Sequence, residues 1–155
     1  MADAATISVT ATMLPDEIAK TITGSMTVTP ADANHKWYYK LTSVSNASTD
    51  LMAGYFTDYL AIDDDTAPTA VNAADKVKFL FVQNTSSADG VVICFDGGTA
   101  AYNLVDGVFV GPSQTWFGRL PNTTVGNPHA ISSDIGDAGD ATANLIVAAL
   151  INDVA

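Results

Sequence analysis

The stretch Val77-Lys78-Phe79-Leu80-Phe81-Val82-Gln83-Asn84, followed by Gly90-Val91-Val92-Ile93-Cys94-Phe95, decides the fold class of this 155-residue chain. Both runs are short and rich in β-branched and aromatic residues, which is typical of β-strands. The residues between them, Thr85 to Asp89, include Ser and Asp, which favour turns. We therefore predict two strands, joined either as a hairpin or as a pair from facing sheets of a sandwich.

Towards the C-terminus, short apolar segments alternate with Gly, Pro and Asp. This pattern predicts strands at 108–110 and 115–120, the second ending at Pro121, and a short segment at 130–133. The apolar run 143–151 fits a helix or a strand by its length alone. We predict a strand in the middle of a sheet, because it completes a sandwich.

Towards the N-terminus, residues 6–12 alternate between apolar and hydroxyl side chains, which indicates a half-buried strand. We expect a short helical turn near Pro15, a second strand over 21–29 and a third over 36–44. A fourth strand is predicted near 53–60, and 63–75 is predicted to be a loop.

These segments predict about nine or ten short strands and no long amphipathic helix. The expected fold is all-β, an antiparallel β-sandwich for which a jelly roll is one arrangement, with at most one or two short helices. A chain of this length is one domain, so we predict a single sandwich over 1–155. The N-terminal strand within 1–12 either adds to the sheet edge of a partner or lies in its own sandwich.

Composition excludes several classes of partner. The chain has 6 basic and 17 acidic residues, a net charge of −11 and a pI near 4.1. Nucleic acids and anionic lipids attract clustered Lys and Arg, so we expect neither a nucleic-acid partner nor a membrane partner. The N-terminus lacks the charged and apolar regions of a signal peptide, and no apolar run is long enough to span a bilayer.

Residue types that carry chemistry are sparse and scattered. Cys94 is the single cysteine and lies in an apolar run, and His35 and His129 share no ligand motif with it. The acidic groups Asp63–Asp65 and Asp134–Asp140 fit solvated turns, with a structural cation as the alternative. We therefore predict no enzyme, no catalytic residue, no cofactor and no assigned metal site.

Aromatic side chains are the best candidates for a binding surface. They are grouped in Trp37-Tyr38-Tyr39, with Tyr55 and Tyr59 further along the chain. Such residues serve as core, as a subunit interface or as a platform on which sugars stack. The candidate interface consists of the N-terminal strand and this group: Ile7, Val9, Trp37, Tyr38 and Tyr39.

The second half of the chain resembles small structural proteins of tailed bacteriophages. The resemblance rests on Lys78–Thr85, on Gly90–Gly98 and on Val110–Pro121, which is Val-Gly-Pro-Ser-Gln-Thr-Trp-Phe-Gly-Arg-Leu-Pro. It covers about residues 78–151. It implies a capsid decoration or cement protein on the surface of the virion head, made in the host cytoplasm. The implied partner is the major capsid protein, whose shell it would stabilise, and the implied state is a homo-oligomer, expected to be a trimer. The alternative is a carbohydrate-binding or tail-associated β-sandwich module.

Overall fold

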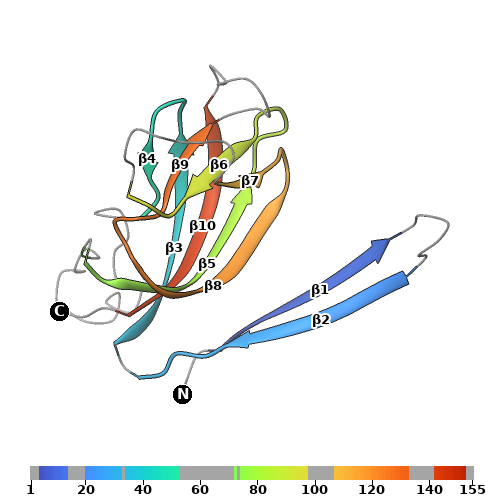
Figure 1. Ribbon diagram of the computed structural model, residues 1–155, viewed down its shortest axis with the longest axis vertical. Helices are drawn as coiled ribbons and strands as arrows, with labels where there is room; N and C mark the ends of the chain where they lie inside the picture. Colours follow the sequence, from blue (N-terminus) through green and yellow to red (C-terminus); the bar gives the residue numbers. More distant parts are fainter. Residues whose placement is uncertain are drawn as a thin grey trace. The chain divides into compact units, whose positions relative to one another are not determined.

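A two-stranded hairpin and a two-sheet sandwich make up the described part of the chain (Figure 1). The structure is a computed structural model that describes residues 4–13, 20–32, 34–52, 72, 74–97, 107–132 and 142–152. These residues form strands and no helix. The chain divides into two units, Met1–Ala33 with the hairpin and Asn34–Ala155 with the sandwich.

The hairpin pairs β1 (Ala5–Met13) with β2 (Lys20–Val28) in antiparallel register. The register runs from Ala5 opposite Val28 to Met13 opposite Lys20. The alternation of hydroxyl and apolar residues therefore continues across both strands. This confirms the predicted strands near 6–12 and 21–29, whereas the predicted helical turn lies outside the described residues.

The sandwich consists of two four-stranded antiparallel sheets. The first has the order β3 (His35–Val44), β10 (Ala143–Asn152), β5 (Lys76–Asn84) and β8 (Thr115–Thr124). The second has the order β4 (Thr49–Asp50), β9 (His129–Ser132), β6 (Val91–Cys94) and β7 (Val108–Val110). Successive strands wrap around the sandwich from sheet to sheet in the order of a jelly roll. The predicted all-β antiparallel sandwich is confirmed.

The core lies between the two sheets. Alternate residues of β3, β10 and β5 point inwards, and the second sheet contributes Val91, Ile93 and Val110. Strand β10 lies between β3 and β5, as the apolar run predicted. Burial of these side chains is the main stabilising contribution to the sandwich. The largest fully buried ones between the sheets are Leu51, Met52, Leu80, Ile93, Leu145 and Ile151.

Asn84 joins the two sheets through a buried amide. The residue is 1% exposed at the end of β5. Its Nδ2 donates to the carbonyl oxygens of Asp89 at 2.7 Å, Gly111 at 3.1 Å and Val110 at 3.3 Å. Its Oδ1 accepts from the backbone N–H of Ser86 at 3.0 Å. A buried amide with these partners fixes the turn after β5 against the end of β7.

Two details differ from the sequence-based expectation. Strands β5 and β6 belong to facing sheets, so of the two predicted arrangements the hairpin is wrong. Strand β8 also continues through Pro121 instead of ending there. Proline is tolerated there for two reasons. Strand β8 is an edge strand, and its pairing with β5 shifts register between Val77 and Phe79. The N–H that Pro121 lacks is therefore not needed for a regular series of hydrogen bonds between the strands.

Several predicted segments fall on residues that the structure does not describe. These are the strand near 53–60, most of the loop 63–75, the acidic group Asp63–Asp65 and the group Asp134–Asp140. The predicted extent of a single domain over 1–155 stays a prediction.

Candidate functional site

Strand β3 gives the predicted aromatic group two different environments. Tyr38 is 2% exposed and packs in the core, whereas Tyr39 on the opposite face is 61% exposed. Trp37 lies on the same face as Tyr39 and is half-buried. The structure thus corrects the expectation for Tyr38, which does not contribute to an exposed surface. The cause is the two-residue period of a strand, which separates neighbours onto opposite faces.

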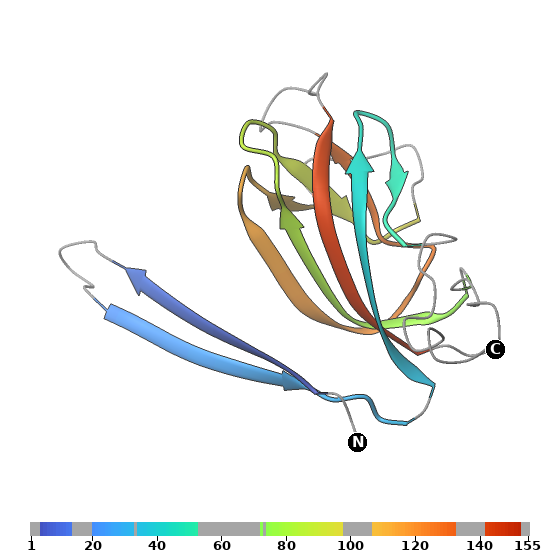
Figure 2. The same ribbon diagram turned by 180° about the vertical axis from the view of Figure 1, so that it is seen from behind.

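The β3–β10–β5–β8 sheet turns one side towards the second sheet and the other side away from it (Figure 2). We call the side that faces away from the core the outer face. The strand register arranges its side chains in parallel rows. The central row is Tyr39, Ala148, Phe81 and Phe117. The flanking rows are Leu41, Ile146, Gln83 and Thr115 on one side, and Trp37, Leu150, Phe79 and Arg119 on the other.

Solvent reaches the central row and the row of Leu41, whereas Leu150 and Phe79 in the third row are 1% and 2% exposed. Leu41, like Tyr39, is 61% exposed, and Phe81, Phe117 and Ile146 are half-buried. Sheets with one solvated face normally carry polar residues on that face. Contiguous exposed apolar patches of this kind mark interaction sites.

Trp37 and Phe79 give the outer face a fixed aromatic edge. Their ring centroids lie 6.0 Å apart with the planes at 70°, an edge-to-face contact. Phe79 is 2% exposed although it lies outside the core between the sheets. An indole held in this way is already positioned for contact with another surface, so docking requires little loss of side-chain entropy.

Polar rows enclose the apolar rows at both ends of the sheet. Ser43 pairs with Asn144 beyond Leu41, and His35 pairs with Asn152 beyond Trp37. Asn152 also pairs with Lys76, which pairs with Thr124. The rows contain no acidic residue, although the chain carries a net charge of −11. An apolar centre with a polar rim is the pattern of a protein–protein interface.

The hairpin has a second exposed apolar face. Opposite pairs Ile7–Met26 and Val9–Gly24 lie on it, with Ala11–Ile22 further from the Ala5–Val28 end. Val9 is 41% exposed, Ile22 is 53% exposed and Ile7 is half-buried. The opposite face carries hydroxyl residues alone: Thr6, Ser8, Thr10, Thr12, Thr21, Thr23, Ser25 and Thr27.

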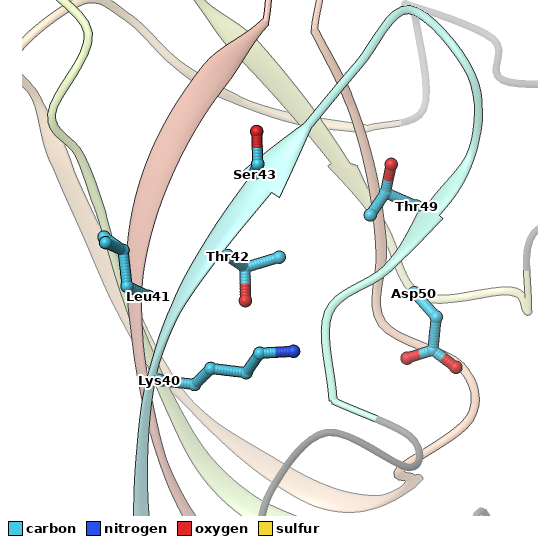
Figure 3. A pocket seen from close by; sticks show the side chains of 6 residues that line it. All are labelled: Lys40, Leu41, Thr42, Ser43, Thr49 and Asp50. Carbon is cyan, nitrogen blue, oxygen red and sulfur yellow. The ribbon is translucent and has the colours of Figure 1, made fainter.

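A small hollow lies between the edges of β3 and β4 (Figure 3). Its volume is about 200 Å³, below the usual range for small-molecule sites. Burial lowers the pKa of Lys40, and the nearby carboxylate of Asp50 partly opposes this effect. Thr42 Oγ1 is buried without a hydrogen-bond partner among the described residues. The hollow therefore offers one ammonium group, one carboxylate and a few hydroxyl groups. Its lining is Lys40, Leu41, Thr42, Ser43, Thr49 and Asp50.

The described part of the chain holds a buried thiol and a hydrogen-bonded hydroxyl–imidazole pair among the groups that could carry chemistry. Cys94 is buried, and no group of three or more His, Cys, Asp or Glu residues there could hold a metal ion. Ser48 Oγ and His129 Nδ1 form a hydrogen bond of 2.8 Å. The strand register places Asp50 opposite His129. A nucleophilic site would also need donors for an oxyanion beside such a group. Within the described residues we find no helical segment with the length and hydropathy needed to cross a membrane.

Sequence reasoning missed most of the outer face. Only Trp37 and Tyr39 were among the predicted interface residues, whereas Leu41, Phe81, Phe117 and Ile146 were not. A signal was present, because the apolar runs of β5 and β10 do not alternate with polar residues. In an antiparallel sheet, such a run indicates that the side facing away from the core is apolar too.

Comparison with known proteins gives no relative. No family model, no curated protein and no solved structure matches the chain.

Proposed function

We propose that this protein is a non-catalytic structural protein that assembles with other protein surfaces through its outer face. The observation that carries this proposal is the row Tyr39, Ala148, Phe81 and Phe117, which lies exposed or half-buried on the outer face. The flanking rows continue the apolar surface with Leu41 and Ile146 on one side and with Trp37, Leu150 and Phe79 on the other. An apolar platform with a polar rim suits a flat protein partner. The hollow between β3 and β4, at about 200 Å³, is small for a substrate site.

The specific role that we propose is that of a capsid decoration protein on the head of a tailed bacteriophage. The support is the resemblance of residues 78–151, together with a jelly-roll strand order, an architecture that occurs in viral capsid domains. Fold alone does not determine function, so this support is by analogy. In this role the protein would bind the major capsid protein and stabilise the shell. We expect it to act as a homo-oligomer, specifically a trimer.

A carbohydrate-binding or tail-associated module is the second candidate, because Trp37 and Tyr39 lie on one exposed face. Sugars stack on aromatic rings but also need polar groups beside them to accept and donate hydrogen bonds. Leu41, Ile146 and Ala148 occupy those neighbouring positions. The aliphatic surroundings favour a protein partner.

Co-sedimentation with heads assembled from the major capsid protein of the same genome tests the decoration role. We expect the wild type to sediment with the heads and the double variant Tyr39→Ser, Leu41→Ser to stay in the supernatant. Ala88→Ser, an exposed change in the turn between β5 and β6, is the control and should bind like the wild type.

A wild type that stays in the supernatant contradicts the decoration role. Equal sedimentation of all three proteins contradicts the use of the outer face. Retention of the wild type on a glycan array, lost in Trp37→Ala, would support the carbohydrate-binding alternative instead.

A further inference from the structure

The outer face differs in charge from the chain as a whole. The chain carries 17 acidic and 6 basic residues, a net charge of −11. The apolar and polar rows of the outer face instead hold Lys76 and Arg119 and no acidic residue. An acidic partner therefore meets attraction on this face, whereas a surface with the average charge of the chain would repel it.

The positive charges gather at one end of the sheet. Arg119 is exposed on β8, and Lys76 is half-buried on β5. Lys78 lies at the shift in register between β5 and β8, and its Nζ donates to the carbonyl oxygen of Pro121 at 3.3 Å. We call Lys76, Lys78 and Arg119 the basic end. They are three of the six Lys and Arg residues of the chain.

An aromatic ring lies beside the basic end. Trp37 is in the same row as Arg119, and its indole is held edge-to-face against Phe79 with the ring centroids 6.0 Å apart. Trp and Arg are among the residue types that contribute most to binding at protein interfaces. The planar guanidinium of Arg119 can also donate two parallel hydrogen bonds to one carboxylate. The basic end therefore suits a protein surface with carboxylates beside an apolar patch.

We infer that the basic end, with Trp37 beside it, binds an acidic edge of the partner protein that the outer face receives. This inference rests on the proposed function, because it names the chemistry of that partner surface. Nucleic acid fits less well, because three basic residues in a chain of net charge −11 neutralise few phosphates. The hairpin also fits less well, because its paired strands carry Lys20 and no acidic residue.

Co-sedimentation with DNA-free heads, assembled from the major capsid protein, tests the sign of the charge. Arg119→Glu reverses the exposed charge of the basic end, and we expect its affinity for the heads to fall by about tenfold or more. The matched control Lys20→Glu makes the same change of charge at another exposed strand position and should bind like the wild type.

Two further measurements separate the charge from the shape of the side chain. A higher ionic strength should weaken binding of the wild type more than binding of Arg119→Gln, because salt screens charge pairs. Arg119→Lys keeps the charge without the planar guanidinium, so its affinity should lie between those of the wild type and Arg119→Glu. Circular dichroism and urea denaturation verify that each variant is folded.

Four results would overturn the inference. One is equal binding of Arg119→Glu and the wild type, and another is an equal loss in Lys20→Glu. Binding of the wild type to duplex DNA that is lost in Arg119→Glu would make nucleic acid the partner. A lower mass of purified Arg119→Glu than of the wild type in light scattering would make a second copy the partner.

The double variant Tyr39→Ser, Leu41→Ser separates this inference from the proposed function. If this variant stays in the supernatant while Arg119→Glu sediments like the wild type, the outer face binds the heads and only the role of the basic end fails. A wild type that stays in the supernatant contradicts both.

Discussion

Asn84 is a buried residue whose amide connects two parts of the sandwich. Its amide donates to backbone carbonyls from the turn after β5 and from the end of β7. An aspartate has nearly the same volume but cannot donate, and it would place a negative charge among carbonyl oxygens. We expect Asn84→Asp to lower the free energy of unfolding by about 3–5 kcal/mol.

Urea denaturation at pH 7 measures this change. Asn144→Asp is the control, because Asn144 is exposed on β10 and should change stability by less than about 0.5 kcal/mol. Similar stability losses in the two variants would show that the amide of Asn84 does not join the sheets.

Ser113 lies in the turn before β8 with a φ of 57°, in the left-handed region. Side chains other than glycine pay a steric cost there. Ser113→Gly should therefore raise stability by about 0.5–1 kcal/mol, visible as a higher Tm in calorimetry. Ser87→Gly, in the turn after β5, should not raise Tm, because Ser87 has no positive φ to relieve. A lower Tm for Ser113→Gly would contradict this account.

Lys40 links stability to pH. Burial lowers its pKa below the ordinary 10.5, so between the lowered pKa and 10.5 the unfolded chain binds more protons than the folded one. At pH values below the lowered pKa, the charged Lys40 destabilises the folded state by the full cost of burying its charge. As the pH rises from the lowered pKa to 10.5, this cost is lost and the free energy of unfolding increases. Lys40→Met should be more stable than the wild type at pH 7, and this advantage should shrink as the pH approaches 10.5.

Thermal denaturation at several pH values measures the difference, with Lys76→Met as the control for loss of one positive charge. An advantage that stays constant up to pH 10.5 would show that the charge of Lys40 is not the cause.

At the scale of the element, β10 separates the core from the outer face. Leu145 is fully buried and Ile146, its neighbour, is half-buried on the opposite face. Leu145→Ala should cost about 2–5 kcal/mol of stability. Ile146→Ala should cost about 1 kcal/mol or less in dilute solution and should instead weaken assembly. Denaturation and sedimentation velocity of both variants measure the two effects, and the reverse pattern would contradict the assignment of the faces.

The strands also show what could be predicted from the sequence. The apolar run 143–151 correctly gave a central strand, and the alternation at 6–12 correctly gave a strand with Ile7 and Val9 on one face. The partners could not be predicted, because pairings such as Leu145 with Thr42 join residues far apart in the chain. The prediction that the strand ends at Pro121 was wrong for a similar reason. A strand accepts proline at the edge of a sheet, and the position of β8 at the edge is known only from the order of the strands.

The candidate site was less predictable than the fold, for a related reason. An apolar residue on a strand can face the core or the opposite side, and the sequence does not say which side of the sheet is covered. Trp37-Tyr38-Tyr39 illustrates this, because the middle residue packs in the core and its neighbours lie on the outer face. The outer face emerges only when β3, β10, β5 and β8 are placed side by side.

At the scale of the whole molecule, the chain carries exposed apolar side chains on two surfaces, one on the hairpin and one on the sandwich. The outer face has an apolar centre and a polar rim, and the hairpin has an apolar face opposite a hydroxyl face. Together they suit a protein whose role is to join others like itself on a larger assembly. The decoration of a phage head, which we propose, is one such role.

The most direct test of this account is sedimentation equilibrium of the purified wild type beside Tyr39→Ser, Leu41→Ser. We predict that the wild type has a mass that is a whole multiple of 16.1 kDa, three times that value for a trimer, and that the variant sediments as a single chain. A wild type of 16.1 kDa at every concentration, or a variant with the same mass as the wild type, would contradict assembly through the outer face.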